Sequence, residues 1–299
     1  MNATRSTSGA ARTVSPGGFT CGRPAVMRRT IDSAHRQTHV DESIVLDGAH
    51  REATGDLLLT RFPNVSRVPS PATALAANRN SGIRQATGEW ILLLDDDTDL
   101  DPSFVQRALV QATTRGRRHV FHAAMREGDS IVLPNAIGYL GFLTRATPVR
   151  WYPAAVSIQA CFFAKSLFAL VGFDEAMVFG YEEIDFACRA AWAGYPAWPV
   201  PDCVNVDLAP DRGSTPYKVT TNFDANRIYM RFKHLWWIHQ RRLDALLFVW
   251  VALLHVGAAQ TLHRGPASAV RHTLRTCTQF SRTVRTYRTH QRRSPTGAR

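Results

Sequence analysis

Glu89-Trp-Ile-Leu-Leu-Leu-Asp-Asp-Asp97 is the stretch of this 299-residue chain that decides its fold. An unbroken apolar run, Trp90 to Leu94, ends at three carboxylates. Such a run is typical of a strand buried on both faces, as in parallel sheets covered by helices. In open α/β sheets the ligand binds just beyond the carboxyl ends of the strands. Three acids at that position repel one another, and a divalent cation carrying an anionic ligand is the simplest way to neutralise them.

The segments around this strand alternate between helical and extended patterns. Pro24 suits the first turn of one helix, Gly88 follows the end of another, and Asp101 is expected to cap a third with Pro102 at its first position. Alternation of this kind describes βαβ units and predicts an α/β fold. Helices are expected at 24–34, 71–87 and 182–193, and strands at 42–47, 90–94, 130–133, 156–163 and 197–206. The last of these strands contains two prolines and should lie near a sheet edge or a bend.

Charge divides the chain into a neutral body and a basic end. Residues 1–230 contain 23 acidic and 23 basic side chains, whereas residues 263–299 contain nine arginines and no acid. This asymmetry indicates an anionic surface as partner, either a membrane or a nucleic acid. Residues 1–18 are rich in Ser, Thr, Arg and Gly and are expected to be a disordered tail. The domain boundaries that we predict are 1–18, 19–235 and 236–299.

The five cysteines are widely spaced and include no C-x-x-C pair. This spacing indicates neither a zinc site nor a disulfide framework, and it favours reduced thiols in a cytoplasmic protein.

A strongly apolar segment, Leu243 to Leu262, precedes the basic end of the chain. Its uninterrupted apolar core, Ala245 to Leu254, is shorter than the roughly 20 residues that span a bilayer, and arginines flank the segment on both sides. Three interpretations stay open: a helix lying in the membrane interface, a helix packed on the domain, and a true span. The first would place the protein peripherally on the inner face of the plasma membrane.

Two motifs resemble those of family 2 glycosyltransferases, which are inverting enzymes of the GT-A fold. The first is Asn78-Arg-Asn-Ser-Gly-Ile-Arg-Gln-Ala-Thr-Gly-Glu-Trp-Ile-Leu-Leu-Leu-Asp-Asp-Asp-Thr-Asp-Leu-Asp-Pro102, and it resembles the central motif of the family. The second combines Gly172-Phe-Asp-Glu175 with Gly180-Tyr-Glu-Glu-Ile-Asp-Phe-Ala-Cys-Arg-Ala-Ala-Trp-Ala-Gly-Tyr195, and it resembles the motif on the acceptor side. The resemblance implies a nucleotide-binding sheet flanked by helices, followed here by a helical, basic C-terminal extension.

The resemblance also implies an activity and a set of site residues. It implies transfer of a hexose or deoxyhexose from a nucleotide diphosphate sugar to an acceptor hydroxyl, with Mg²⁺ or Mn²⁺. Asp95 and Asp97 would form the D-x-D pair that holds the metal and the diphosphate, with Asp96 between them. Asp47 would face the nucleoside, Glu183 would be the catalytic base, and the donor would also meet Arg79 and Asn80.

Elementary chemistry supports these assignments. Acids at i and i+2 beyond a strand end project to the same side, and hard cations prefer carboxylate oxygens. Inversion by single displacement requires a base opposite the leaving group. Glu182, Glu183 and Asp185 crowd a helix N-terminus, where the helix dipole and mutual repulsion shift pKa values in opposite directions. These three acids are therefore the candidate catalytic carboxylates.

Other functions are compatible with parts of the sequence. A haloacid-dehalogenase-type phosphatase would use Asp95 as its nucleophile. A degraded glycosyltransferase could act only as a binding protein, since Thr13 to Arg23, where the resemblance implies a first strand and turn, contains Pro16 and three glycines. The sequence does not identify the acceptor, and a glycan, a lipid-linked sugar and a small molecule are all compatible with it. The arginine-rich end has few interleaved aromatic residues, so an anionic membrane surface is a candidate partner and specific nucleic-acid binding is not expected.

Overall fold

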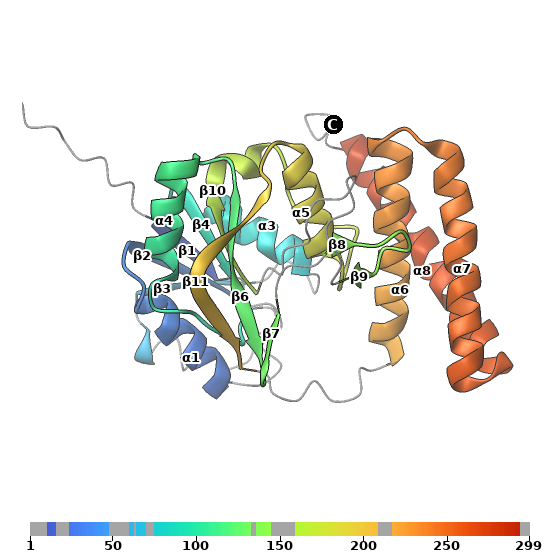
Figure 1. Cartoon of the computed structure of the whole chain (residues 1–299), viewed down its shortest axis with the longest axis horizontal. Helices are drawn as coiled ribbons and strands as arrows, with labels where there is room; N and C mark the ends of the chain where they lie inside the picture. Colours follow the sequence, from blue (N-terminus) through green and yellow to red (C-terminus); the bar gives the residue numbers. More distant parts are fainter. Residues whose placement is uncertain are drawn as a thin grey trace, which may run out of the picture.

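The computed structural model describes residues 11–15, 24–47, 60–62, 64–69, 75–132, 136–144, 159–208 and 217–293. Figure 1 shows a sheet with helices on both faces in one half of the molecule and a group of long helices in the other half. The chain therefore has the α/β sheet flanked by helices, and the helical C-terminal region, that the sequence predicts.

The main sheet has the order β3-β2-β1-β4-β10-β6-β11-β5, with β7 paired to β6. Strands β3, β2, β1 and β4 are mutually parallel, whereas β10 runs antiparallel to both β4 and β6. Strand β11 is parallel to β6 and antiparallel to the short β5. The strands are β1 (Ala11–Ser15), β2 (Val40–Asp47), β3 (Val65–Pro69), β4 (Trp90–Leu94), β5 (Thr98–Asp99), β6 (Val120–Glu127), β7 (Ser130–Val132), β10 (Ala160–Ala164) and β11 (Ala197–Asp207).

The first strand lies inside the segment that we assigned to a disordered tail. Ala11–Ser15 pairs in parallel with β2 on one side and with β4 on the other, so it occupies the middle of the parallel half of the sheet. Its sequence, Ala-Arg-Thr-Val-Ser, has no apolar run, and for that reason the sequence pattern did not reveal it. The assignment of residues 1–18 to a tail is thus wrong for Ala11–Ser15.

The apolar run in β4 separates two hydrophobic layers. All five residues of β4 are at most 5% exposed. Ile91 and Leu93 pack in the layer beneath α3 (Leu75–Gln85) and α5 (Glu182–Trp192). Trp90, Leu92 and Leu94 pack in the opposite layer, with residues of α1 (Pro24–His35) and α4 (Phe104–Arg115). Burial on both faces, as the unbroken run predicts, therefore produces a three-layer arrangement.

Most of the expected elements are confirmed. Strand β4 and helices α1 and α5 have nearly the predicted bounds, and strands β2, β7 and β10 overlap their predicted segments. Helix α3 is described from Leu75, so the expected start at residue 71 lies outside the described residues. Strand β11 shows a register shift between Pro199 and Val204 and lies next to the edge strand β5, in agreement with the expected bend. The 3₁₀ turn Lys165–Ala169 follows β10.

Helix α4 begins later than we predicted. Its first helical residue is Phe104 and its N-cap is Ser103, whereas Asp101 and Pro102 were expected to open it. Asp101 accepts hydrogen bonds from the backbone N–H and the hydroxyl of Ser103, at 2.9 and 2.7 Å. These two bonds make a local turn before the helix, so Asp101 stabilises the approach to α4 instead of capping it.

Helix α1 holds the segment that follows β4. The Thr30 hydroxyl donates to the backbone carbonyl of Asp96 at 3.0 Å, and Ser33 accepts from the N–H of Leu100. Arg29 and Arg36 both form ion pairs with the Asp99 carboxylate. The segment after the D-x-D pair is therefore fixed in position by side chains of α1.

The other half of the molecule contains three long helices and a small hairpin. They are α6 (Tyr217–Lys233), α7 (Arg242–Arg264) and α8 (Pro266–Arg293), with a π-helical turn at His234–Ile238 between α6 and α7. The hairpin of β8 (Ala136–Ile137) and β9 (Leu143–Thr144) packs on them through the ring pairs Tyr139–Phe248 and Phe142–His255. Within the described residues, α7 is the one helix that is long and apolar enough to cross a membrane. The four cysteines among the residues that the structure describes, Cys161, Cys188, Cys203 and Cys277, are free thiols.

Candidate functional site

The edge of the sheet beyond β4 brings together polar groups from three strands. The N–H of Asp95 donates to the carbonyl of Gln159, just before β10, and the N–H of Leu208, just after β11, donates to the carbonyl of Asp97. The Gln159 amide donates to the Asp207 carboxylate at 3.3 Å. Asp95 and Asp97 therefore share this edge with Gln159 and Asp207, and both aspartates are half-buried.

Arg79 on α3 connects this edge to the start of α5. One guanidinium nitrogen donates to Asp95 Oδ1 at 2.9 Å, and the other terminal nitrogen donates to Glu182 Oε1 at 3.0 Å. Arg79 is only 2% exposed. The carboxylates of Asp95, Glu182 and Glu183 all raise the pKa of Arg79 against the opposing effect of its burial. Within the residues that the structure describes, the Arg79 guanidinium thus interacts with three acids from two separate segments of the chain.

The first turn of α5 presents its two adjacent glutamates differently. Glu182 is 2% exposed and is bound by Arg79, whereas Glu183 is half-buried. Before them, Gly180 and Tyr181 both have positive φ, at 86° and 68°. Positive φ in a residue such as Tyr181 is strained and persists only where neighbouring structure imposes it. Asn226 of α6 imposes it here, because its side-chain amide donates to the carbonyls of Phe179 and Gly180.

Asn80 anchors the Gly172-Phe-Asp-Glu175 turn to α3. Its amide nitrogen donates to the carbonyl of Phe173 at 2.9 Å and to the carboxylate of Glu175 at 2.8 Å, and its oxygen accepts from the N–H of Phe173. All of the described bonds of Asn80 are thus made to this turn. Through Arg79 and Asn80, α3 holds the start of α5 and the Gly172–Glu175 turn next to the edge that contains Asp95.

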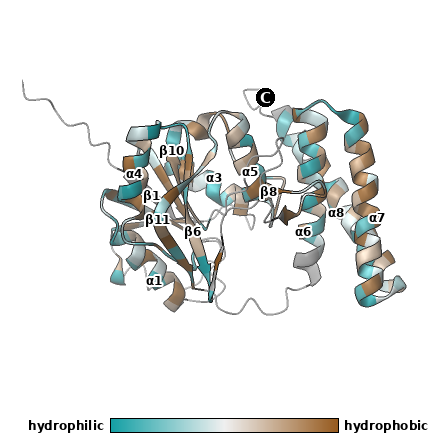
Figure 2. Cartoon of the chain, viewed as in Figure 1, coloured by the Kyte–Doolittle hydropathy of each residue, from teal (hydrophilic) through white to brown (hydrophobic). Residues whose placement is uncertain are grey.

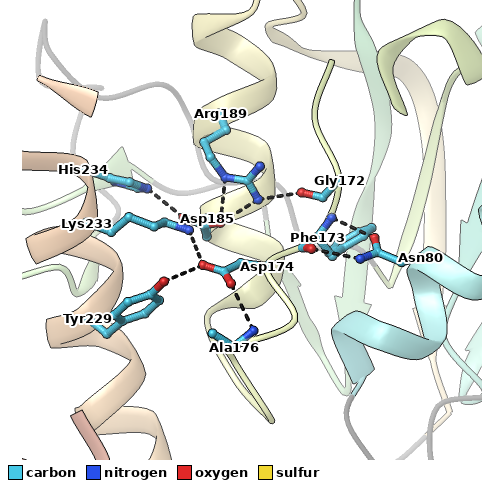
Figure 3. A network of polar contacts seen from close by, with 10 residues as sticks. All are labelled: Asn80, Gly172, Phe173, Asp174, Ala176, Asp185, Arg189, Tyr229, Lys233 and His234. Carbon is cyan, nitrogen blue, oxygen red and sulfur yellow. Dashed lines mark hydrogen bonds and ion pairs between the residues drawn. The ribbon is translucent and has the colours of Figure 1, made fainter. Parts of the chain in front are cut away.

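Asp185 lies in a different environment from the two glutamates. Figure 3 shows its carboxylate in a network that joins α5 to the end of α6. It contacts Lys233 Nζ at 2.6 Å, the His234 ring at 2.9 Å and the Arg189 guanidinium at 2.7 Å. Asp185 is fully buried, and despite that burial the charges of Arg189 and Lys233 hold its pKa well below its usual range.

The same network contains the acid of the Gly-Phe-Asp-Glu turn. Asp174 Oδ2 accepts from the Tyr229 hydroxyl and from Lys233 Nζ, both at 2.7 Å, while Asp174 Oδ1 accepts from the N–H of Ala176. Arg189 also donates to the carbonyl of Gly172 at 2.7 Å. Two motif acids, Asp174 and Asp185, are therefore neutralised by α6 and α5 cations, and the C-terminal helices form part of the scaffold of the site (Figure 3).

The structure separates the predicted site residues into two groups. It brings together Asp95, Asp97, Arg79, Glu182 and Glu183 at one edge, with Asp96 in the same turn. Arg79 and Asn80 make bonds to protein groups where we expected contacts with the donor, and Asp185 lies in the buried network. Asp47 ends β2, and its side chain lies outside the described residues. Gln159 and Asp207 were absent from the predicted set, although Asp207 directly ends a strand.

The donor set suits a hard divalent cation that is shared with a phosphate ligand. Within the described part of the chain, no three His, Cys, Asp or Glu side chains gather closely enough to enclose a metal. Mg²⁺ is usually held by one or two carboxylates together with substrate phosphates and waters, so a protein cage is not required. Asp95 and Asp97 offer carboxylate oxygens at one edge of the sheet, which is the type of ligand that a hard cation prefers. The residues present therefore fit such an ion.

Two buried histidines make the fold sensitive to acid. Burial lowers the pKa of His234 and of His122 to about 4 in each case, and both are at most 4% exposed. In the unfolded chain each histidine ring is protonated below about pH 6.5, whereas in the folded chain it stays neutral down to about pH 4. The free energy of unfolding therefore falls as pH falls from about 6.5 towards 4. At about pH 5, each histidine is expected to lower the free energy of unfolding by about 2 kcal/mol.

Urea unfolding at about pH 7 and about pH 5 measures this effect. His234→Gln keeps a donor for Asp185 without a titrating ring, and it should reduce the loss of stability on acidification. His263→Gln, at an exposed histidine, is the matched control and should leave that loss unchanged. Equal losses in wild type and His234→Gln would contradict the assignment.

Comparison with known proteins places these motifs in a family context. Residues 19–164 match the model of glycosyl transferase family 2. No curated protein sequence matches the chain significantly.

Solved structures share the fold at low sequence identity. The mannosyltransferase PcManGT from Pyrobaculum calidifontis, solved in complex with GDP-Man and Mn²⁺, aligns with a TM-score of 0.57 and 16% identity over 91% of this chain and 87% of that one. S. aureus TarS 1-349 aligns with a TM-score of 0.51 and 12% identity over 94% and 92% of the two chains. A further S. aureus TarS structure has a TM-score of 0.50 and 13% identity over 75% of this chain and 43% of that one. The structural alignments show a common GT-A fold, and sequence identities this low leave the substrates open.

Proposed function

We propose that the protein transfers a sugar from a nucleotide diphosphate to an acceptor hydroxyl with inversion at the anomeric carbon. The match of residues 19–164 to the model of glycosyl transferase family 2 supports this proposal. The donor is a nucleotide sugar, as in the PcManGT complex with GDP-Man, and the cofactor is Mg²⁺ or Mn²⁺.

The observation that carries this proposal is the bridge made by Arg79. Asp95 belongs to the D-x-D motif and Glu182 to the acceptor-side motif, and the two are 87 residues apart in the sequence. Arg79 contacts both carboxylates, at 2.9 and 3.0 Å. The donor-side and acceptor-side acids thus belong to one site, as a direct displacement requires.

Burial selects the base from the three candidate acids. Glu182 is paired with Arg79 and closed off from solvent, and Asp185 is fully buried among Lys233, His234 and Arg189. Glu183 is half-buried in the first turn of α5, beside the same guanidinium. We therefore assign proton abstraction from the acceptor hydroxyl to Glu183.

Asp95 and Asp97 would hold the divalent ion, and Asp96 would face the donor from the same turn. Bound to the diphosphate, the ion supplies Lewis-acid stabilisation of the leaving group. The chain's own contribution is placement: α1 fixes the turn after Asp95, and Arg79 fixes the Asp95 carboxylate. Arg79 then acts as a positioning residue and does not itself contact the diphosphate.

A nucleotide-sugar panel tests the proposal. The full chain is incubated with Mn²⁺ and UDP-, GDP- or dTDP-linked sugars, first alone and then with glycan, lipid-linked and small hydroxyl acceptors. Release of nucleoside diphosphate from at least one donor is expected, and NMR of the product should show the inverted anomer. Tight, metal-dependent binding of nucleoside diphosphate without any turnover would instead identify a degraded enzyme.

Metal removal is expected to lower transfer by about 100-fold or more, since the ion's stabilisation is worth several kcal/mol. Chelation with EDTA should abolish donor hydrolysis, and added Mn²⁺ should restore it. Asp97→Asn should raise the Mn²⁺ concentration needed for half-maximal rate. Asp99→Asn is the matched control, because Asp99 is already paired with Arg29 and Arg36, and it should keep the wild-type metal requirement. Full activity in EDTA would refute the metal assignment.

A further inference from the structure

Helix α7 buries one apolar face and exposes another. Ala245, Phe248, Ala252 and Val256 are at most 3% exposed and pack in a cluster with residues of α6. On the opposite side, a second set of large apolar residues is between 55% and 83% exposed. This set, which we call the α7 stripe, consists of Leu243, Leu246, Leu247, Trp250 and Leu254.

The α7 stripe is a continuous surface feature. Its members are three or four residues apart, or adjacent, so they fall on one side of the helix. Figure 2 shows α7 as a largely hydrophobic helix, and Figure 1 places it at the edge of the molecule away from the sheet. Soluble monomers rarely expose contiguous apolar patches of this kind without an interaction partner. The stripe therefore indicates a contact surface.

Positive charge lies at both ends of the stripe and on the adjoining helix. Arg242 precedes the stripe and Arg264 ends the helix, whereas Arg241 is paired with Asp244. On the adjoining α8, Val270 and Leu274 are 60% and 62% exposed. The exposed arginines of α8 are Arg271, Arg275, Arg282, Arg285 and Arg288. Residues 263–299 contain no acid that would offset these charges.

We propose that the α7 stripe and the arginines of α8 dock the protein onto an anionic lipid bilayer, with α7 lying in the plane of the interface. Leucines and a tryptophan next to arginines match a bilayer surface, because acyl chains accept the apolar side chains and anionic headgroups accept the guanidinium groups. This proposal is independent of sugar transfer, since none of these residues belongs to the candidate site.

The same observations disfavour the two other occupants. If α7 crossed the bilayer, α8 packed along it would carry exposed arginines into the hydrocarbon, at about 2.5–3.5 kcal/mol for each one. If a second copy covered the stripe, the arginines beside the two stripes would repel each other. An anionic surface satisfies both the apolar residues and the charges.

Vesicle flotation of the full chain tests the proposal. Vesicles of phosphatidylcholine with phosphatidylglycerol are compared with vesicles of phosphatidylcholine alone. Wild type should float with the anionic vesicles, and the double variant Leu246→Glu/Trp250→Glu should bind them at least about tenfold more weakly. Val110→Glu on α4 is the matched control, because Val110 is 54% exposed on another face, and it should bind as wild type does.

A second measurement does not depend on introducing charge. Brominated lipids quench tryptophans that enter the acyl region, and Trp250→Phe should remove most of that quenching while leaving flotation intact. Light scattering without lipid should show that the stripe does not mediate self-association. The proposal is overturned by absence of binding to anionic vesicles, by undiminished binding of the double variant, by quenching that survives Trp250→Phe, or by a lipid-free dimer that the double variant dissociates.

Discussion

Glu183→Gln is expected to lower kcat by about 10²–10⁴-fold, the range typical for loss of a general base. The amide has the shape of the carboxylate but cannot take the proton of the acceptor hydroxyl. Donor binding should be unchanged, because Asp95 and Asp97 are untouched, and the free energy of unfolding should hardly move, because Glu183 is half-buried. Steady-state transfer kinetics, calorimetry with nucleoside diphosphate and urea unfolding measure the three quantities.

The neighbouring glutamate provides the matched control. Glu182→Gln makes the same chemical change one residue earlier, at a side chain that is 3% exposed and bound to Arg79 at 3.0 Å. Loss of that charge weakens a buried charged hydrogen bond, so we expect about 1–3 kcal/mol of destabilisation. If Glu182→Gln loses turnover at full stability while Glu183→Gln keeps it, Glu182 is the base.

The local pattern of the sequence was enough to predict the sheet around β4. Strand 90–94 needs burial on both faces, and the apolar run states that requirement directly. Strand β1 could not be found in the same way, because Ala11–Ser15 has a polar sequence and is held by backbone pairing with β2 and β4. A strand that forms because of pairing with its neighbours does not need a hydrophobic pattern of its own, so its sequence does not predict it.

Among the site residues, position was predictable and partnership was not. The acids of the D-x-D motif end a strand, and the glutamates open a helix, so their locations followed from the pattern. Arg79 was expected at the diphosphate, but its partners are Asp95 and Glu182, the second of them 103 residues away. Ion pairs between distant segments depend on packing, which the periodicity of one segment does not contain.

Asp185 shows the same limit more clearly. Its place in an acidic first turn of a helix is shared with Glu182 and Glu183, so the three looked alike in the sequence. Lys233 and His234, which lie about 50 residues later, determine its environment. The contact with α6 is what distinguishes Asp185 from Glu183, the acid that we propose as the catalytic base.

Lys233→Met is expected to destabilise the protein by about 3–5 kcal/mol, the cost of removing one partner of a buried ion pair. Lys233 Nζ lies 2.7 Å from Asp174 and 2.6 Å from Asp185, and all three side chains are at most 5% exposed. Without the ammonium group, the two carboxylates are left in low dielectric with Arg189 as the remaining cation. Urea unfolding monitored by circular dichroism measures the change.

Arg241→Met is the matched control for this variant. It removes a basic residue from an ion pair that is mostly exposed, with side chains 63% and 45% accessible, and it should cost about 0–1 kcal/mol. Similar losses in the two variants would show that the buried network contributes no more than a surface pair.

A double-mutant cycle then separates charge from packing. Lys233→Met leaves one uncompensated negative charge, and adding Asp174→Asn removes that charge. The double variant should therefore lose less free energy of unfolding than the sum of the two single losses, by about 0.5–3 kcal/mol, the range found for coupled groups. Strict additivity would mean that Lys233 acts through its hydrocarbon stem alone.

Because Asp185 is in the first turn of α5 beside Glu183, a coupled network also predicts that kcat of Lys233→Met falls at temperatures where the variant is still folded. Unchanged kcat in the folded variant would show that the C-terminal helices stabilise the fold but do not influence catalysis at the site.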